Sequence, residues 1–229
     1  MDFSNFEKGI GYKFKKKELL QRSLTHRSYL NENPSWQHPH NERLEFLGDA
    51  VLELAVTEEL FNRYPNRPEG EMTSLRAAMV NTISLSEVGH NIELNDALLM
   101  SKGEARDLGR GREAILADGV EAVIGAIYLD GGYEKAKNFI LDNILVKLSN
   151  ILAHNLHIDA KSHLQERVQA ERKLTPHYSV ISEEGPDHDK QFTVGVYFGK
   201  DLITEGAGHS KHEAEVEAAR KALEKLEEI

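Results

Sequence analysis

The sequence is organised around the stretch Asn41-Glu42-Arg43-Leu44-Glu45-Phe46-Leu47-Gly48-Asp49. Its three acids are spaced i, i+3 and i+7, and at about 100° per residue they fall within roughly 60° of one another on a helix. Leu52 and Val56 continue this acidic stripe, which predicts a helix over residues 40–64 whose acids are partly buried. Apolar residues fall on the opposite side of the same helix: Leu44, Leu47, Val51, Leu54 and Ala55.

A second acidic pair follows later in the chain. Asp118 and Glu121 are spaced i, i+3 within the apolar run 117–125, which predicts another helix over residues 114–129. A single pair of this kind is usually a solvated helix face, but carboxylates with apolar surroundings repel one another and need a compensating cation. Two such helices predict one oxygen-lined site for a hard divalent metal. Carboxylates without thiolates favour Mg²⁺ or Mn²⁺ over zinc.

The amino-acid composition excludes several classes of protein and of metal site. The 229 residues contain no cysteine, so disulfides and thiolate metal sites are excluded, and a reducing compartment, the cytoplasm, is expected. We expect no membrane span, because no apolar run approaches the length that one needs, and the acidic N-terminus does not resemble a signal peptide. The net charge of −10 argues against a globally basic nucleic-acid binder. A nucleic-acid site must therefore be local or use a metal as its positive charge.

The secondary structure that the sequence predicts changes near residue 158. Before it, apolar spacing predicts only helices, including 16–30, 72–81, 83–89 and 133–152, with a turn at 65–70 and a basic, glycine-containing loop at 101–111. After it come a helix (160–173), three strands (177–182, 190–198 and 202–206) and a last helix (211–226). The predicted fold is an all-α domain over residues 1–155, followed by a small α+β domain of order α-β-β-β-α over residues 158–229.

Several of these motifs resemble the ribonuclease III family. The stretch 41–49 matches that family's signature, residues 117–122 match its second acidic motif, and Thr25-His26-Arg27-Ser28 matches an upstream block. The C-terminal part is similar to a double-stranded-RNA-binding domain at 176–178, 185–188 and 206–211. The motifs occur in the family's order and spacing, and the resemblance covers nearly the whole chain.

The resemblance implies a homodimeric, Mg²⁺-dependent endonuclease that cuts double-stranded RNA and leaves 5′-phosphate and 3′-hydroxyl ends. Mn²⁺ is expected to substitute for Mg²⁺, and precursors of ribosomal RNA and other transcripts, including messenger RNAs, are the expected substrates. Carried over position by position, the metal ligands are Glu45, Asp49, Asp118 and Glu121, with Asp49 and Glu121 as catalytic residues. Glu42 and Glu69 match two further acids of the family's catalytic valley.

The same resemblance assigns RNA contacts in the C-terminal domain. Polar side chains on one helix suit the shallow minor groove of A-form RNA, and a helix N-terminus suits phosphate. His212 stands where relatives usually carry a second lysine, so a neutral histidine weakens that phosphate clamp and makes it pH-sensitive. The alternative to an RNA contact for Gln165 and Gln169 is that they lie on a solvated helix face without a binding role. The expected contacts are Ser162, Gln165, Glu166 and Gln169 on the first helix, His188 in a loop, and Ser210 and Lys211 at the start of the last helix.

Some assignments stay open at this stage. Phe46 lies beside the acids and is either covered by a neighbouring loop or buried by a second subunit, and the resemblance favours the dimer contact. His26 is expected to be structural rather than a catalytic base. The basic residues of the loop either contact phosphates or form a solvated charge run: Lys102, Arg106, Arg110 and Arg112.

Three functions are compatible with these patterns. The first is a double-stranded-RNA endoribonuclease, which the intact acids Glu45, Asp49, Asp118 and Glu121 favour. The second is an RNA-binding or chaperone-like protein whose acids are only structural. The third is a metal phosphohydrolase of small substrates, against which the C-terminal domain argues.

Overall fold

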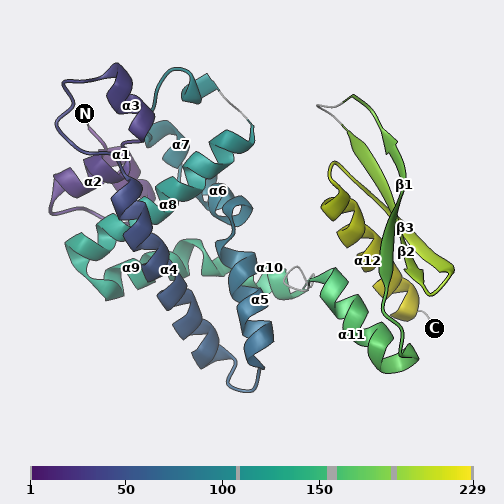
Figure 1. Ribbon diagram of the computed structural model, residues 1–229. Helices are drawn as coiled ribbons and strands as arrows, with labels where there is room; N and C mark the ends of the chain where they lie inside the picture. The colour runs from purple at the N-terminus through teal and green to yellow at the C-terminus, as the bar shows by residue number, and fades with distance from the viewer. Residues whose placement is uncertain (1, 107–108, 154–158, 187–189, 228–229) are drawn as a thin grey trace. The chain divides into compact units, whose positions relative to one another are not determined.

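The chain folds into two compact units, Met1–His157 and Ile158–Ile229, which we describe from a computed structural model (Figure 1). The structure describes residues 2–106, 109–153, 159–186 and 190–227. The first unit is helical and the second is α+β, which confirms the predicted fold class. Residues 155 and 158, where the sequence places the domain ends, lie outside the described residues.

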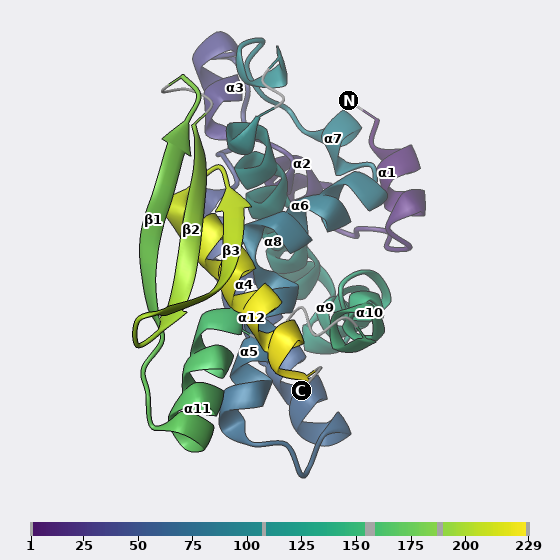
Figure 2. The ribbon, with the colours of Figure 1, turned by 90° about the vertical axis from the view of Figure 1, so that its right-hand side faces the viewer.

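The first unit is built around two long helices, α4 (Glu42–Arg63) and α8 (Arg110–Gly131), which pack against each other (Figures 1 and 2). Apolar residues of both helices are buried between them, and Leu52 and Val56, which continue the acidic stripe, are 0% exposed as predicted. None of the described helices is long and apolar enough to cross a membrane. The other helices are α1 (Ser4–Gly9), α2 (Lys17–Ser23), α3 (Arg27–Glu32), α5 (Glu69–Val80), α6 (Thr82–Asn91), α7 (Leu94–Ala97), α9 (Tyr133–Asn143) and α10 (Leu148–Ala153), with short 3₁₀ turns at Glu104–Arg106 and Leu145–Lys147.

Some apolar residues of α4 lie outside its contact with the core. Leu54 was expected on the core side with Leu44 and Val51, but it is 57% exposed. Phe46 is 81% exposed and Phe61 69% exposed, so no loop among the described residues of the first unit covers Phe46. Together with Ala50 these residues form an exposed apolar stripe along α4. We refer to Phe46, Ala50, Leu54 and Phe61 as the α4 stripe.

The predicted helix over 16–30 is wrong in its middle. The chain forms α2 and α3 instead, because a bridge between Thr25 and Leu99 interrupts the helical hydrogen bonds. The N–H of His26 donates to the carbonyl of Leu99 (2.9 Å), and the N–H of Leu99 donates to the carbonyl of Leu24 (2.8 Å). His26 then caps α3 by accepting a bond from the N–H of Ser28 (3.3 Å), which gives it the expected structural role.

Three other boundaries also differ from the sequence pattern. The helix predicted over 133–152 breaks after Asn143 into a 3₁₀ turn and α10, and buries Ile144, Leu145 and Leu148 in succession. The turn predicted at 65–70 ends early, because α5 already begins at Glu69. The basic loop also ends early, since α8 begins at Arg110. At the first of these boundaries, burial of the three side chains overrides the local helical pattern.

The second unit is a three-stranded antiparallel sheet with two helices. Its elements are α11 (Ala160–Arg172), β1 (His177–Glu184), β2 (Gln191–Phe198), β3 (Asp201–Gly208) and α12 (Lys211–Glu227), and the strands lie in the order β1-β2-β3. The predicted hairpin between β2 and β3 is confirmed, and Gly199 takes a φ of +65° in its turn. Figure 2 shows α12 along one face of the sheet. A Cβ on Gly206 would lie 2.2 Å from the backbone N of Ala218, so glycine lets α12 rest directly on β3.

Candidate active site and nucleic-acid interface

The crossing of α4 and α8 is a backbone-to-backbone contact. A Cβ added to Gly48 would lie 1.7 Å from the carbonyl oxygen of Glu121, and one added to Gly125 would lie 2.2 Å from the carbonyl oxygen of Leu44. Glycine is therefore required at both positions for this approach. The contact places Glu45, one turn before Gly48, beside the acids of α8. A glycine within an apolar helical run is the sequence signal for such close packing.

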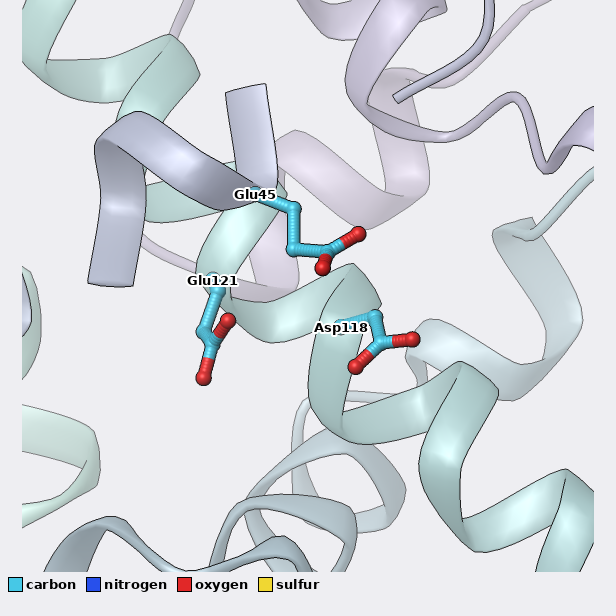
Figure 3. A group of neighbouring side chains, drawn as sticks. All are labelled: Glu45, Asp118 and Glu121. Carbon is cyan, nitrogen blue, oxygen red and sulfur yellow. The ribbon is translucent and has the colours of Figure 1, made fainter. Parts of the chain in front are cut away.

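Three carboxylates meet at this crossing. Glu45 comes from α4, and Asp118 and Glu121 come from α8 (Figure 3). One oxygen from each lies within 4.8 Å of the others, and all three side chains are half-buried. Figure 3 shows the three carboxylates around a shared space. We call this group the acidic cluster. Its spacing suits oxygen coordination of a single hard cation.

Burial and mutual repulsion raise the pKa values of the acidic cluster. Burial is the largest cause for Glu121, followed by the charge of Asp49, and with the other nearby acids they raise its pKa to about 8. Burial and then the charge of Asp118 are the main causes that raise the pKa of Glu45 to about 7. Burial and then the charge of Glu42 raise the pKa of Asp118. Three ionised carboxylates are therefore unfavourable here unless a cation joins them.

Asp49 and Glu42 lie near the acidic cluster but not within it. Asp49 is exposed, and its charge is felt by both Glu45 and Glu121. Glu42 pairs with Arg27 (Nη1–Oε1, 3.5 Å) and lies 3.7 Å from Nδ1 of His40. Both acids therefore add negative charge at the rim of the site. Of the four predicted metal ligands, the structure brings three within reach of one ion, with Asp49 beside them.

Glu69 lies elsewhere on the first unit. It is exposed at the start of α5 and lines a pocket of about 200 Å³ with Leu60, Phe61 and Met72, beside the C-terminal half of α4. Glu45 lies near the opposite end of that helix. Within its own chain, Glu69 therefore does not join the acidic cluster.

Comparisons with known proteins identify the family of the chain. A family model described as ribonuclease-III-like matches residues 16–148, and one for the double-stranded RNA binding motif matches residues 160–226. The chain belongs to the ribonuclease III family. As a member of this family, it is an endoribonuclease that cleaves double-stranded RNA.

Relatives of this ribonuclease III match along nearly all of their length. Ribonuclease 3 of Desulforamulus reducens is 44% identical over 218 residues, which cover 95% of this chain and 89% of the relative. Ribonuclease 3 of Borreliella burgdorferi is 42% identical over 229 residues, which cover 100% of this chain and 89% of the relative. The nuclease domain of ribonuclease III from Campylobacter jejuni superposes with a TM-score of 0.57 at 42% identity, covering 62% of this chain and 96% of that domain.

The RNA-facing helix predicted for this ribonuclease III is exposed. On α11 the core side carries Ala160, Leu164 and Val168, all buried, and the other side points to solvent. The hydroxyl of Ser162 donates to Oδ2 of Asp159 (2.6 Å). The solvent side carries the four predicted minor-groove residues, Ser162, Gln165, Glu166 and Gln169.

The start of α12 carries the predicted phosphate clamp. Ser210 Oγ accepts a bond from the N–H of Glu213 (3.1 Å), so this hydroxyl caps the helix. Lys211 Nζ lies 3.0 Å from Oε1 of Glu183 on β1 and 5.6 Å from the centre of the Phe192 ring. The sequence did not reveal this ion pair, because Glu183 is far from Lys211 along the chain. His188, the remaining predicted contact, lies outside the described residues.

Arg112 does not serve as a phosphate contact. Its side chain is 8% exposed, and its guanidinium donates from Nε to Oδ1 of Asn95 (3.0 Å) and contacts the sulfur of Met100. It ties the start of α8 to the segment before the basic loop. Glu53, which shares the acidic stripe, is likewise structural and pairs with Arg76 (2.9 Å).

Proposed function

We propose that this ribonuclease III uses Mg²⁺, held by Glu45, Asp49, Asp118 and Glu121, to hydrolyse double-stranded RNA to 5′-phosphate and 3′-hydroxyl ends. The proposal assigns cleavage to residues 1–155 and duplex binding to residues 158–229. Mn²⁺ has the same preference for oxygen ligands and is expected to substitute. Processing of ribosomal-RNA precursors and messenger RNAs, and a cytoplasmic location, stay predictions of the family resemblance.

The observation that carries the proposal is the acidic cluster. Its three carboxylates converge from two helices within 4.8 Å and offer only oxygen, the donor set that Mg²⁺ prefers. Their raised pKa values fit a site that is completed by a cation. Thiolate ligands are absent from the sequence, which disfavours a zinc centre.

The acids divide by their position in the site. Mg²⁺, when bound, neutralises charge on the phosphodiester and lowers the pKa of water. Glu45, Asp118 and Glu121 would hold the ion from the half-buried side of the site, because the α4–α8 crossing fixes their backbones. Asp49 approaches from the exposed side, where the phosphodiester must arrive. Glu42 adds charge at the rim and is held there by Arg27.

Substitution of Glu121 tests this assignment. Glu121→Ala should abolish cleavage of a plain RNA duplex in Mg²⁺ and leave duplex binding intact, because binding resides in the other domain. Glu113→Gln is the matched control, since Glu113 is an exposed acid in the first turn of the same helix. Product ends are identified on the wild-type digest. Wild-type cleavage by Glu121→Ala would contradict the metal site. Duplex binding without Mg²⁺-dependent cleavage by the wild-type protein would instead support a pure RNA-binding function.

We also propose that the chain works as a homodimer joined through the α4 stripe. Phe46, Leu54 and Phe61 are more than half exposed, which is unusual for large apolar side chains that share one helix face. A pocket with apolar residues of α4 and α5 lies beside the end of the stripe. The related nuclease domain from Campylobacter jejuni has a region involved in dimer formation.

A two-fold dimer gives Glu69 a place at an active site. In an isologous contact whose two-fold axis runs perpendicular to α4 through the middle of the stripe, the N-terminal half of one stripe meets the C-terminal half of its partner. Phe46, next to Glu45, then faces the pocket that Glu69 lines in the second copy. Glu69 therefore reaches the catalytic valley of the partner rather than its own. Two such sites face one duplex, one for each strand.

A further inference from the structure

The segment between α7 and α8 is hydrogen-bonded to α3, beside which it lies in Figure 1. We call residues 99–106 of this segment the docked loop. The N–H of Ser101 donates to Oγ of Ser28 (2.9 Å), and the N–H of Lys102 donates to both carboxylate oxygens of Glu32 (3.3 and 3.2 Å). Two side chains of α3 therefore fix the backbone of a loop that is distant in the sequence.

The hydroxyl of Ser28 is oriented by the cap of its own helix. Its Oγ lies 2.8 Å from Nδ1 of His26, and the same nitrogen accepts the N–H of Ser28 (3.3 Å). Burial is the main cause that lowers the pKa of His26, so the ring is neutral near neutral pH and Nδ1 can accept the hydroxyl proton. The lone pairs of Oγ then face the N–H of Ser101. Ser28 is therefore arranged as an acceptor for the docked loop.

The docked loop begins beside the acidic cluster. A Cβ added to Gly119, the neighbour of Asp118, would lie 3.0 Å from Cδ2 of Leu94 and 3.4 Å from Cδ2 of Leu98, so the segment that leads into the loop packs on α8 there. The backbone of Leu99, the next residue, pairs with the segment before α3. The start of the loop is therefore held between α8 and that segment.

The first turn of α3 also contacts the rim of the same site. Arg27, which precedes Ser28, pairs with Glu42 (Nη1–Oε1, 3.5 Å). After burial, the charges of Glu104 in the docked loop and of Glu42 at the rim are among those that act on the ring of His26, which lies near both. The start of α3 therefore connects the docked loop to the rim of the acidic cluster.

The docked loop brings positive charge close to an acidic site. Lys102 and Arg106 are exposed, and among the described residues no ion pair involves either side chain. The net charge of the chain is −10, so local cations are needed to offset repulsion when an RNA duplex approaches. Where these two cations lie depends on where the backbone of the loop is held.

We propose that Ser28 and Glu32 are positioning residues for duplex cleavage, which hold the docked loop beside the acidic cluster and so set the affinity of the nuclease unit for duplex RNA. The inference rests on the proposed cleavage at the acidic cluster. Neither side chain needs to contact RNA or metal, because each acts through a backbone N–H of the loop. Loss of either acceptor should therefore raise KM for the duplex and leave kcat close to the wild-type value.

Two substitutions of Glu32 separate positioning from charge. Glu32→Gln keeps an oxygen that can accept the N–H of Lys102, whereas Glu32→Ala does not, and both remove the same negative charge. Loss of this charge alone should tighten RNA binding equally in the two variants. When the full-length protein cleaves a plain duplex in Mg²⁺, KM of Glu32→Ala should be on the order of fivefold above that of Glu32→Gln, a difference typical of one hydrogen bond. Glu18→Ala is the charge control, because Glu18 is an exposed acid in the first turn of α2, and its KM should not exceed the wild-type value.

Substitution of Ser28 tests the second acceptor in the same assay. Ser28→Ala should raise KM by a similar factor, and Ser28→Thr, which keeps the hydroxyl, should restore the wild-type KM. Ser23→Ala is the matched control, because the hydroxyl of the buried Ser23 donates to the carbonyl of Leu20 within α2 (2.9 Å) and does not contact the loop. Its KM should equal that of the wild type.

The split between KM and kcat distinguishes positioning from a loss of folded protein. A smaller folded fraction, which circular dichroism detects, lowers the apparent kcat and leaves KM unchanged. A wild-type KM in Ser28→Ala, or equal KM values in Glu32→Ala and Glu32→Gln, would overturn the inference while the proposed function stands. A wild-type protein without Mg²⁺-dependent cleavage would overturn both.

Discussion

Gly48 of α4 lies directly against the carbonyl oxygen of Glu121 on α8, with no room for a side chain between them. Glu121, a proposed catalytic acid, therefore also provides the backbone carbonyl against which Gly48 of α4 packs. The distance between Glu45 and Glu121 is set by this backbone contact rather than by their own side chains. The geometry of the acidic cluster depends on two glycines that take no part in the chemistry.

The first prediction concerns this contact. Gly48→Ala would place Cβ 1.7 Å from the Glu121 carbonyl oxygen, so α4 and α8 must separate. Overpacking of this kind costs about 1–3 kcal/mol, and a backbone obstacle places the cost at the upper end. We expect a lower free energy of unfolding in urea and a large loss of cleavage. Gly70→Ala is the control, because a Cβ there meets nothing within 4 Å, so it should not lower stability or cleavage. Wild-type stability of Gly48→Ala would show that the helices do not touch at this point.

The second prediction concerns competition between protons and the metal. The pKa of Glu45 is raised to about 7 and that of Glu121 to about 8, so without metal both carry protons at about pH 6. A cation must displace these protons. Mg²⁺ affinity measured by calorimetry should therefore rise from about pH 6 to about pH 8.5, with protons released on binding. In Glu121→Gln the proton release should be smaller. Affinity that does not vary with pH would contradict the raised pKa values.

The third prediction concerns stability without metal. The carboxyl groups of Glu45 and Glu121 have higher pKa values in the folded protein than in the unfolded chain. At a pH between the unfolded and the folded pKa of each group, the folded state therefore binds more protons than the unfolded chain does. Their contribution to stability is therefore favourable at low pH and is lost as the pH rises through the folded pKa values. In EDTA, the melting temperature should fall between about pH 6 and about pH 8.5.

Two comparisons isolate this effect from the overall charge of the protein. Glu121→Gln should show a flatter pH dependence of the melting temperature in EDTA, because one of the titrating groups is gone. Mg²⁺ should restore the wild-type melting temperature most strongly at high pH, where the ionised cluster binds it best. A wild-type melting temperature that rises with pH in EDTA would have the wrong sign for this mechanism.

The fourth prediction concerns the α4 stripe. Phe46→Asp puts a charge at its N-terminal end, and in a homodimer that charge would be buried against the partner at a cost of several kcal/mol. We expect a monomer by light scattering and greatly reduced cleavage, with the fold retained by circular dichroism. Ile83→Asp is the matched control, since Ile83 is 65% exposed on α6, away from the stripe. A wild-type protein that is monomeric and fully active would rule out the dimer.

Much of this protein can be predicted from local sequence. The burial of Leu52 and Val56 follows from helical periodicity, as does the division into a helical part and an α+β part. The β2–β3 hairpin follows from the glycine at position 199, whose positive φ other residues adopt with difficulty. Such features depend on interactions between residues that are close in the sequence, so the local sequence is enough to predict them.

Local periodicity predicted the structure less well where segments that are distant in the sequence pack together. The break at Thr25 comes from pairing with Leu99, and Leu54 is exposed although the helical pattern places it with the buried Leu44 and Val51. Arg112 was grouped with a basic loop, but it is buried against Asn95. None of these partners is near in sequence, so no spacing rule could find them.

By itself the sequence determined the residue types that the proposed chemistry uses. These are acids on two apolar helices, no thiolates, and polar side chains on one face of the helix proposed to contact RNA. Tertiary structure alone decided that Glu45, Asp118 and Glu121 share one space while Glu69 does not, and that Ser28 and Glu32 accept hydrogen bonds from the docked loop. The physical reason is that residue type and periodicity are local properties. Convergence depends on how closely two backbones can approach, and here Gly48 and Gly125 set that distance.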